Sequence, residues 1–269
     1  MINTTFDKPK VMGILNITPD SFYDGNRYVD EKSILNRVEV MLSEGADIID
    51  VGAFSSRPGA KPVSENEERK RLLPNIKTIV KHFPDVVISV DTYRSKIAKE
   101  VLAEGAQIIN DISAGNLDEK MFETIAKLQA PYIMMHMQGT PENMQKNPVY
   151  KDVVSEVISF FETKIEALAK LNHHQLIIDP GFGFGKTLSN NYELLHRLEA
   201  FSALNKPVLV GISRKSMLYK LLQQTPEQML NASTVANTIA ILKGAKILRV
   251  HDVKEACEII KITQYDYSK

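Results

Sequence analysis

The chain has 269 residues, of which 43% are apolar, and its 33 basic residues balance 33 acidic ones. This length is enough for one large core, and lengths near about 250 residues are typical of single-domain barrels. A balanced charge gives no reason to expect nucleic acid or an anionic membrane as a partner.

The N-terminus and the cysteine content indicate the compartment. The first ten residues carry no apolar segment of signal-peptide length, and no apolar run approaches the roughly 18 residues of a membrane span. Cys257 is the only cysteine, which excludes an internal disulfide and fits a reducing environment. We therefore expect a soluble, cytoplasmic protein.

Short apolar segments recur along the chain and are mostly continuous rather than alternating. Continuous apolar strands are typical of a parallel sheet that is covered on both faces. The expected strands lie at 11–15, 48–51, 86–90, 107–109, 132–135, 176–178, 208–212 and 246–250.

Helical patterns alternate with these strands, and each is long enough for a crossover. They lie at 33–44, 65–82, 94–104, 118–129, 151–172, 190–203, 226–243 and 253–262. Eight strands that alternate with eight helices predict a closed (β/α)₈ barrel, a single domain over residues 1–269 with its core at about 10–262. A doubly wound open sheet is the alternative.

Polar side chains stand at the ends of the expected strands. In a barrel these positions meet at the C-terminal face, where barrel enzymes keep their sites. Helix capping is the alternative for Asp111, Ser213 and Asp252, and a satisfied core position is the alternative for His136. The strand-end residues are Asn16, Asp91, Asn110, Asp111, His136, Asp179, Ser213, Arg214, Lys215, Arg249, His251 and Asp252.

The ring of strand ends holds two kinds of chemistry. Asp91, Asn110 and Asp179 offer acceptors and one amide donor, which suit a heterocycle with N–H donors along one edge. Bare backbone and aromatic faces follow Asp179 in the segment GFGFG at 181–185, and they suit a flat ligand. A second group of Lys215, Arg249 and His251 suits a diphosphate or another anion.

Other polar features are open to simpler interpretations. His173 and His174 lie between a helix and a strand, where we expect them to be solvated. No spacing of His, Cys and Asp indicates structural zinc. The loops at 16–25 and 55–60 are either surface connections or lids that close over a substrate.

Eight motifs in order resemble the dihydropteroate synthase family of folate biosynthesis. They are ILNITPDSFYDG, SSRPGA, SVDTYRS, IINDI, MHMQGTP, DPGFGFGKT, GISRKSM and GAKILRVHDV, and the likeness as a whole covers the chain from about Lys10 to Ile262. The resemblance implies a (β/α)₈ barrel, small-molecule substrates and a homodimer. It also implies condensation of (7,8-dihydropterin-6-yl)methyl diphosphate with 4-aminobenzoate to 7,8-dihydropteroate and diphosphate, and a target for sulfonamides.

The resemblance also implies roles for individual residues, with Mg²⁺ as the cofactor and Asn16 as its ligand. It makes Lys215, Arg57 and Asp91 the residues that take part in the chemistry. Pterin binding is implied for Asp91, Asn110, Met135, Asp179, Phe184 and Lys215, diphosphate binding for Asn16, Arg249 and His251, and 4-aminobenzoate binding for Ser56, Arg57, Pro58 and Ser216.

The sequence departs from the family pattern at a few positions. Ala53 and Phe54 stand where Gly-Glu is common, Ser56 replaces Thr, and Tyr23 replaces a small residue. The hydroxyl at position 56 survives, so these changes concern loop packing more than 4-aminobenzoate binding.

Two other functions remain as alternatives. A methyltetrahydrofolate-binding methyltransferase domain should lack the Arg57 loop and the motif at 213–216, and both are present. A non-catalytic pterin-binding paralogue should lose Asn16, Arg249 or His251 while it keeps Asp179, and all four are present.

Overall fold

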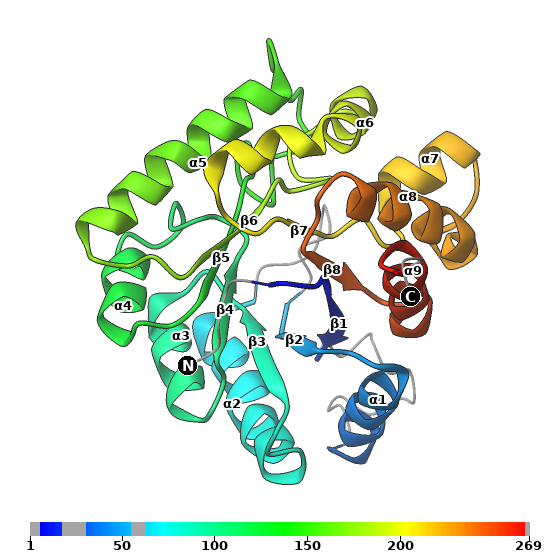
Figure 1. Cartoon of the computed structure of the whole chain (residues 1–269). Coiled ribbons are helices and arrows are strands. Elements are labelled where there is room, and N and C mark those ends of the chain that lie inside the picture. The colour runs from blue at the N-terminus through cyan, green and yellow to red at the C-terminus, as the bar shows by residue number, and fades with distance from the viewer. Residues whose placement is uncertain (1–5, 18–30, 55–62, 267–269) are drawn as a thin grey trace.

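The computed structural model describes residues 6–17, 31–54 and 63–266, and its centre is a barrel of parallel strands (Figure 1). The strand order β6-β5-β4-β3-β2-β1-β8-β7 pairs each strand with its neighbours along the chain, and β1 pairs with β8. The strands are β1 (Lys10–Asn16), β2 (Ile48–Gly52), β3 (Val87–Asp91), β4 (Ile108–Asp111), β5 (Tyr132–Met135), β6 (Leu176–Asp179), β7 (Leu209–Val210) and β8 (Ile247–Val250).

The sheet closes between β6 and the residues that precede β7. Ile178 forms a parallel bridge with Val208, and its backbone N–H donates to Pro207 O at 3.0 Å. The prediction of a (β/α)₈ barrel is therefore confirmed, and the open doubly wound sheet is excluded.

Helices surround the strands as an outer ring (Figure 1). Polar caps start several of them, including Ser64 before α2, Asp152 before α5 and Thr187 before α6, each of which accepts a backbone N–H. The helices are α1 (Glu31–Glu44), α2 (Glu65–His82), α3 (Ser95–Ala103), α4 (Met121–Leu128), α5 (Val153–Lys170), α6 (Leu188–His196), α7 (Ser216–Leu222), α8 (Leu230–Leu242) and α9 (Val253–Thr263).

Two of the predicted helices are each divided in the structure into an α-helix and a 3₁₀ segment, and one further helix was not predicted. The helix expected at 190–203 is α6 followed by a 3₁₀ helix at Leu198–Leu204. The helix expected at 226–243 is a 3₁₀ turn at Pro226–Gln228 followed by α8. The seven-residue helix α7 was missed because two turns are too short to show a helical period.

An apolar layer fills the N-terminal end of the barrel interior, and the next layer of inward-pointing side chains rests on it. Side chains from seven strands form this layer: Met12, Ile48, Ile108, Ile133, Ile177, Leu209 and Ile247. Because strand side chains alternate with a period of two, the residues two positions later also point inward. That next layer therefore contains Asp50, Asn110, Met135, Asp179 and Arg249.

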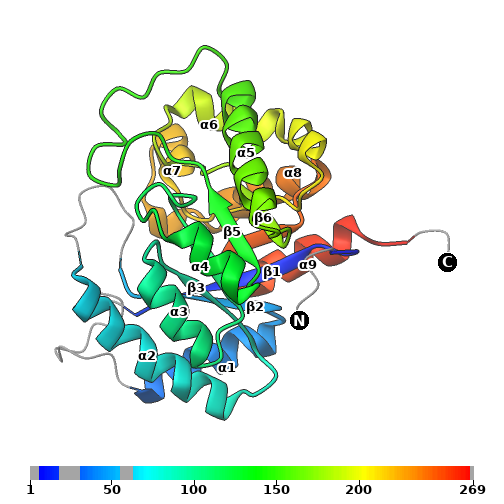
Figure 2. The ribbon, with the colours of Figure 1, turned by 90° about the vertical axis from the view of Figure 1, so that its left-hand side faces the viewer.

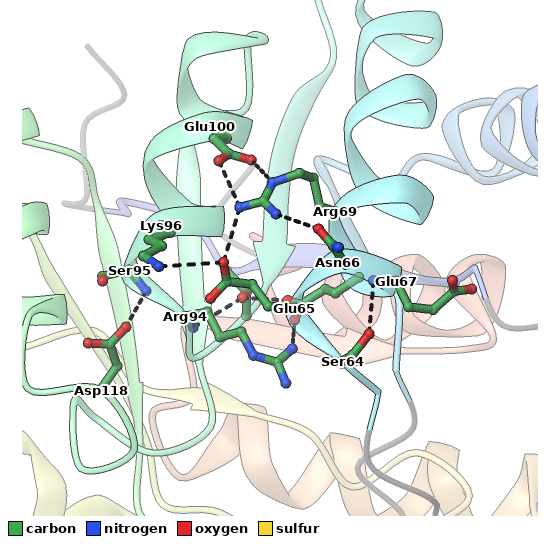
Figure 3. A network of polar contacts seen from close by, with 12 residues as sticks. Ser64, Glu65, Asn66, Glu67, Arg69, Arg94, Ser95, Lys96, Glu100 and Asp118 are labelled. Carbon is green, nitrogen blue, oxygen red and sulfur yellow. Dashed lines mark hydrogen bonds and ion pairs between the residues drawn. The ribbon is translucent and has the colours of Figure 1, made fainter.

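Polar contacts join α2 to α3 on the outside of the barrel (Figure 3). Arg69 donates to Glu100 at 2.6 and 3.0 Å and to Glu65 at 3.1 Å. Arg94 pairs with Glu68, a carboxylate that is fully buried, and also donates to Val63 O at 2.6 Å. The contacts of Arg94 to Val63 O and Glu68 therefore hold the start of α2 against α3.

Among the helices within residues 31–54 and 63–266, none is both long enough and apolar enough to cross a membrane.

The expectation that His173 is solvated was wrong. The His173 side chain is buried between α5 and β6, whereas His174 is exposed. Burial lowers the pKa of His173 from its usual 6.5, with His174 and Lys206 acting in the same direction.

Stability should therefore fall at acidic pH because of His173. The pKa of the folded protein lies below the unfolded value of 6.5, so below that pH the unfolded chain binds the proton more readily. Between about pH 8 and pH 5 this residue should remove at most about 2 kcal/mol from the free energy of unfolding. Denaturant titrations should show a smaller loss in His173→Leu than in His174→Gln, the control at the exposed neighbour. Equal losses would contradict the assignment.

Candidate active site

A charge network spans the barrel interior at the level above the apolar layer. The Arg249 guanidinium donates from Nε to Asp50 Oδ2 at 2.7 Å and from Nη2 to Asp91 Oδ2 at 3.3 Å. Asn110 donates its amide N–H to the same Asp50 oxygen at 3.1 Å. Asp50 therefore connects Arg249, which was expected to bind an anion, with Asn110, which was expected to bind a heterocycle.

The carboxylates of this network are held away from water and are incompletely satisfied. Burial raises the pKa of Asp91 to about 7, although Arg249 opposes the rise, and Asp50, Asp111 and Asp179 add to it. Two oxygens, Asp50 Oδ1 and Asp91 Oδ1, are buried without a hydrogen-bond partner among the described residues. Buried acceptors without partners are costly, so this region suits a ligand that brings N–H donors.

Asp179 ends β6 beside a turn that bends back toward it. Its Oδ1 accepts the backbone N–H of Gly181 at 2.8 Å. Burial raises the pKa of Asp179, while Lys215, Gly181, Arg249 and Lys186 act to lower it. Asp179 is 6% exposed as a whole residue, so its carboxylate lies in a largely buried position at the end of β6.

Lys215 lies across the same turn. Its ammonium donates to Phe182 O and stands 4.5 Å from the centre of the Phe184 ring, a cation–π distance. Burial lowers the pKa of Lys215 to about 8, although Asp179 opposes this change. A largely protonated lysine over an aromatic face fits one side of a slot for a flat ring.

An apolar wall completes the slot. Met135 and Phe184 belong to one buried cluster, as predicted for residues that line a common pocket. The other members are Ile112, Met137 and Met144, with Phe54 and Tyr93 packed against them. The loop between β5 and α5, which carries Met137 and Met144, projects beyond the strands in Figure 2.

Two glycines of the turn have the same backbone conformation but different surroundings. Gly181 has φ +74°, and a Cβ there would lie 1.9 Å from His136 O. Gly183 has φ +80°, and the nearest atom to its Cβ would be Lys215 Cδ at 3.4 Å. Of these two positions, 181 requires glycine for space as well as for its backbone angle, whereas 183 requires it for the angle alone.

Alanine at these two positions should have unequal effects. Gly183→Ala should cost about 1–2 kcal/mol of unfolding free energy, the usual strain of a left-handed residue. Gly181→Ala should cost clearly more and should weaken ligand binding, because the His136 carbonyl and β5 must move. Denaturant unfolding of both variants measures this difference. Equal losses would mean that the turn shifts freely.

Asn16 ends β1 on the other side of the mouth. It pairs with Gly52, and a Cβ on Gly52 would lie 3.6 Å from both Asn16 Oδ1 and Asp91 Cβ. Asn16 and Asp91 are therefore close neighbours across β2. Among the described residues no group of three or more His, Cys, Asp or Glu could hold a metal ion.

His251 and Arg214 belong to the β7–β8 edge of the mouth. His251 Nδ1 lies 3.1 Å from Ser213 Oγ, which also accepts the His251 backbone N–H. Arg214 is paired with Asp252 at 2.6 and 3.0 Å, and Asp252 makes no side-chain capping bond to α9. The capping interpretation of Asp252 was therefore wrong, and Arg214 is directed away from the central network.

Asp111 is structural. It accepts from Ser113, Gly115 and Tyr132, which form the turn after β4 and a contact to β5. The helix-capping interpretation of Asp111 was therefore wrong, because its donors belong to the turn after β4 and to β5 rather than to a helix.

The structure brings most of the predicted site residues together. Asp91, Asn110, Asp179, Lys215 and Arg249 are linked by contacts or by electrostatic coupling. Ser216 follows Lys215 as the first residue of α7. The predictions for Ser56, Arg57 and Pro58, and most of both proposed lids, lie outside the described residues.

Two residues were missed by sequence reasoning. Asp50 was visible as an interruption of an apolar strand, and that charge was the signal. Lys186 ends the glycine-rich segment, and its side chain is buried beneath the turn.

Comparison with known proteins agrees with this geometry. Residues 12–251 match the family model described as pterin binding enzyme. The dihydropteroate synthase of Escherichia coli K12 is 45% identical over 258 residues, which are 95% of this chain and 91% of the relative.

Solved structures show the same similarity. The Yersinia pestis dihydropteroate synthase with a sulfonamide drug has a TM-score of 0.90 and 43% identity, covering 96% of this chain and 94% of that one. A Xanthomonas albilineans dihydropteroate synthase in complex with 7,8-dihydropteroate has a TM-score of 0.86 and 35% identity, covering 97% and 94%.

Proposed function

The chain belongs to the pterin-binding enzyme family, and from that membership we infer that it catalyses the dihydropteroate synthase reaction. It condenses (7,8-dihydropterin-6-yl)methyl diphosphate with 4-aminobenzoate to give 7,8-dihydropteroate and diphosphate in folate biosynthesis. The observation that carries this inference is the near-complete match to synthases, together with unsatisfied buried carboxylates at the strand ends. The relatives matched are synthases, which favours this reaction over a methyltransferase domain.

The interior of the barrel binds the pterin in this proposal. Asp179, Asn110 and Asp91 accept its ring and amino N–H groups, and Met135 and Phe184 cover its faces. Support comes from the unpartnered Asp91 Oδ1 and from the largely buried position of Asp179 at the end of β6. A pterin that donates to Asp91 would favour the ionised form of this residue, whose pKa is about 7 in the free protein.

The diphosphate is bound at the β1–β8 side of the mouth in this proposal, by Arg249, His251 and Asn16. A single amide oxygen on Asn16 fits a Mg²⁺ ion that takes its remaining ligands from water and phosphate oxygens. When bound, Mg²⁺ would help to stabilise negative charge on the diphosphate. Ser56, Arg57, Pro58 and Ser216 receive 4-aminobenzoate, and sulfonamides compete for the same place.

The reaction needs charge stabilisation more than proton transfer. The C–O bond from the methylene carbon to the diphosphate breaks, and its electron pair leaves with the diphosphate. The pterin ring shares the positive charge that remains, in an SN1-like path, and Asp91 and Asp179 stabilise it. The neutral aromatic amine then forms the C–N bond and loses its proton to solvent, so no general base is required.

A turnover assay tests this function. The protein is mixed with the pterin diphosphate, 4-aminobenzoate and Mg²⁺, and both dihydropteroate and diphosphate are measured. We expect equal amounts of the two products, and little of either without Mg²⁺ or 4-aminobenzoate. Pterin binding without product would identify a non-catalytic paralogue and contradict the proposal.

A homodimer is also proposed, with α8 at the contact. Val235 is 53% exposed and Leu242 is 70% exposed, and their seven-residue spacing places them on one face of α8. Leu230, at the start of α8, is also exposed, whereas Met229 just before it is fully buried.

Light scattering should give twice the mass of one chain at micromolar concentration. Val235→Glu combined with Leu242→Glu should give the monomer, since charges would replace apolar contacts. Leu128→Glu, at an exposed position on α4, is the control. A monomeric native protein would refute the proposal.

The cytoplasmic location likewise remains a proposal. It is supported by the thiol of Cys257, which is free and donates to Gly45 O at 3.3 Å.

A further inference from the structure

A buried lysine lies directly behind the glycine-rich turn. Lys186 is 3% exposed, and its ammonium contacts His136 Nδ1, Gly181 O and Phe184 O at 3.0 Å each. A fourth acceptor, His136 O, is 3.4 Å away. Lysine is rarely buried, and no carboxylate of the described residues forms an ion pair with this ammonium, so this arrangement requires an explanation beyond ordinary packing.

His136 is a suitable partner because it stays neutral. Burial and the charge of Lys186 lower the pKa of His136 to about 2, so its ring stays neutral and Nδ1 can accept a hydrogen bond from the ammonium. The ring is also held edge-on against Phe160 with centroids 4.9 Å apart. The satisfied core position considered for His136 is thus confirmed, and its partner is Lys186.

The carbonyls bound by Lys186 are the two ends of the turn. Phe184 N also donates to Gly181 O at 3.1 Å, so the Gly181 carbonyl accepts hydrogen bonds from both Phe184 N and the Lys186 ammonium. Between these ends, Phe182 O accepts from Lys215. The side chain of Lys186 therefore fixes the backbone that places the Phe184 ring and that directs the Gly181 N–H to Asp179.

Lys186 also acts on Asp179 through its charge. The cationic groups around Asp179 are Lys215, Arg249 and Lys186, and all three lower its pKa against the effect of burial. Asp91 is the carboxylate that interacts electrostatically with Asp179. The groups that act on Lys186 are Asp179 and Lys215, while burial lowers the pKa of Lys186 to about 7. Removing the Lys186 ammonium would make the Asp179 carboxylate easier to protonate.

We propose that Lys186 is a positioning residue for the pterin end of the site, which holds the turn 181–185 and keeps Asp179 ionised without touching the substrate. The proposal rests on the proposed function, because Asp179 is the pterin acceptor there. It differs from a purely structural role, which would hold the turn but leave the ionisation of Asp179 unchanged.

The first test is the pH dependence of pterin binding in Lys186→Met, which keeps most of the side-chain volume and removes the ammonium. Calorimetry with the pterin diphosphate between about pH 5 and pH 9 should show about tenfold weaker binding near neutral pH, as expected for the loss of charged hydrogen bonds. The midpoint at which affinity is lost on acidification should move to higher pH. Asp91 also titrates between about pH 5 and pH 9, in both proteins. The quantity compared is therefore the difference between the affinity midpoint of Lys186→Met and that of the native protein.

Lys164→Met is the matched control. Lys164 is half-buried on α5, where it donates to Asn116 and lies 5.3 Å from the centre of the Phe122 ring. Its replacement should leave both the affinity and the midpoint as in the native protein.

Two variants of His136 test the same contact if Lys186→Met fails to fold. Asparagine can place an acceptor near the position of Nδ1, whereas leucine cannot. His136→Asn should bind the pterin within about twofold of the native protein, and His136→Leu about tenfold more weakly.

The outcomes separate this inference from the proposed function. Native affinity and an unmoved midpoint in Lys186→Met, or equal affinities of the two His136 variants, would overturn the positioning role. A weaker affinity with an unmoved midpoint would also overturn it, in favour of a structural role. If the native protein bound no pterin at all, the proposed function itself would fail.

Discussion

Replacing Asp179 with asparagine should weaken binding of the pterin diphosphate about tenfold to a hundredfold. At least one charge-assisted hydrogen bond from the ring would be lost, and the loss of one such bond costs about 1.5–3 kcal/mol. The asparagine side chain also cannot accept hydrogen bonds from both Gly181 and the pterin, because only one of its two terminal atoms is an acceptor. Oδ1 already accepts the Gly181 N–H, so one orientation turns NH₂ toward that donor and the other turns it toward the pterin.

Calorimetry on the folded variant measures this loss. The control is Asp111→Asn, at the end of β4, where the donors are Ser113, Gly115 and Tyr132. Asp111→Asn should lower the free energy of unfolding without a selective loss of pterin affinity. Unchanged pterin affinity in Asp179→Asn would remove Asp179 from the pterin site.

Replacing Arg249 with methionine should have two separate effects. Asp50 is fully buried and pairs with Arg249, so the variant leaves a buried carboxylate without its cation. Breaking such a pair typically costs about 3–5 kcal/mol of unfolding free energy. The affinity for the pterin diphosphate should also fall more than the affinity for the bare pterin, because only the ester carries the anion.

A double variant separates stability from binding. Asp50→Asn combined with Arg249→Met removes the unpaired charge, so most of the lost stability should return in denaturant titrations. The diphosphate affinity should stay low in calorimetry. If both ligands weakened equally in the single and double variants, Arg249 would serve the fold rather than the anion.

The fold was predictable because the sequence repeats one unit. Continuous apolar strands followed by amphipathic helices leave a closed parallel barrel as the simplest solution, and the capping residues Ser64, Asp152 and Thr187 mark where α2, α5 and α6 begin. Short elements were less predictable. Two turns of α7 and the two residues of β7 are held by their neighbours more than by their own pattern.

The site was predictable where a residue type is unusual for its position. Asp91, Asn110, Asp179 and Lys215 stand at strand ends and point to ligand chemistry in the sequence alone. Asp50 was harder, because both faces of these strands are apolar and the sequence does not show which residues face inward. Closure of the barrel decides it, through the layer of Ile48 and its neighbours.

Lys186 could not be assigned from local sequence at all. Its ring partner, His136, lies 50 residues earlier in the chain, and the contact exists only because β5 and β6 are neighbours. In the sequence, the lysine resembles an exposed residue before a helix.

The most direct measurement is a crystal structure of the native protein with the pterin diphosphate and Mg²⁺. We expect the N–H edge of the pterin within hydrogen-bond distance of Asp179, Asn110 and Asp91, and the diphosphate against Arg249 and His251. We also expect Arg249 to exchange part of its contact with Asp91 for phosphate oxygens. A pterin bound elsewhere, with Asp91 Oδ1 still unpartnered and the Arg249–Asp91 contact intact, would contradict the account.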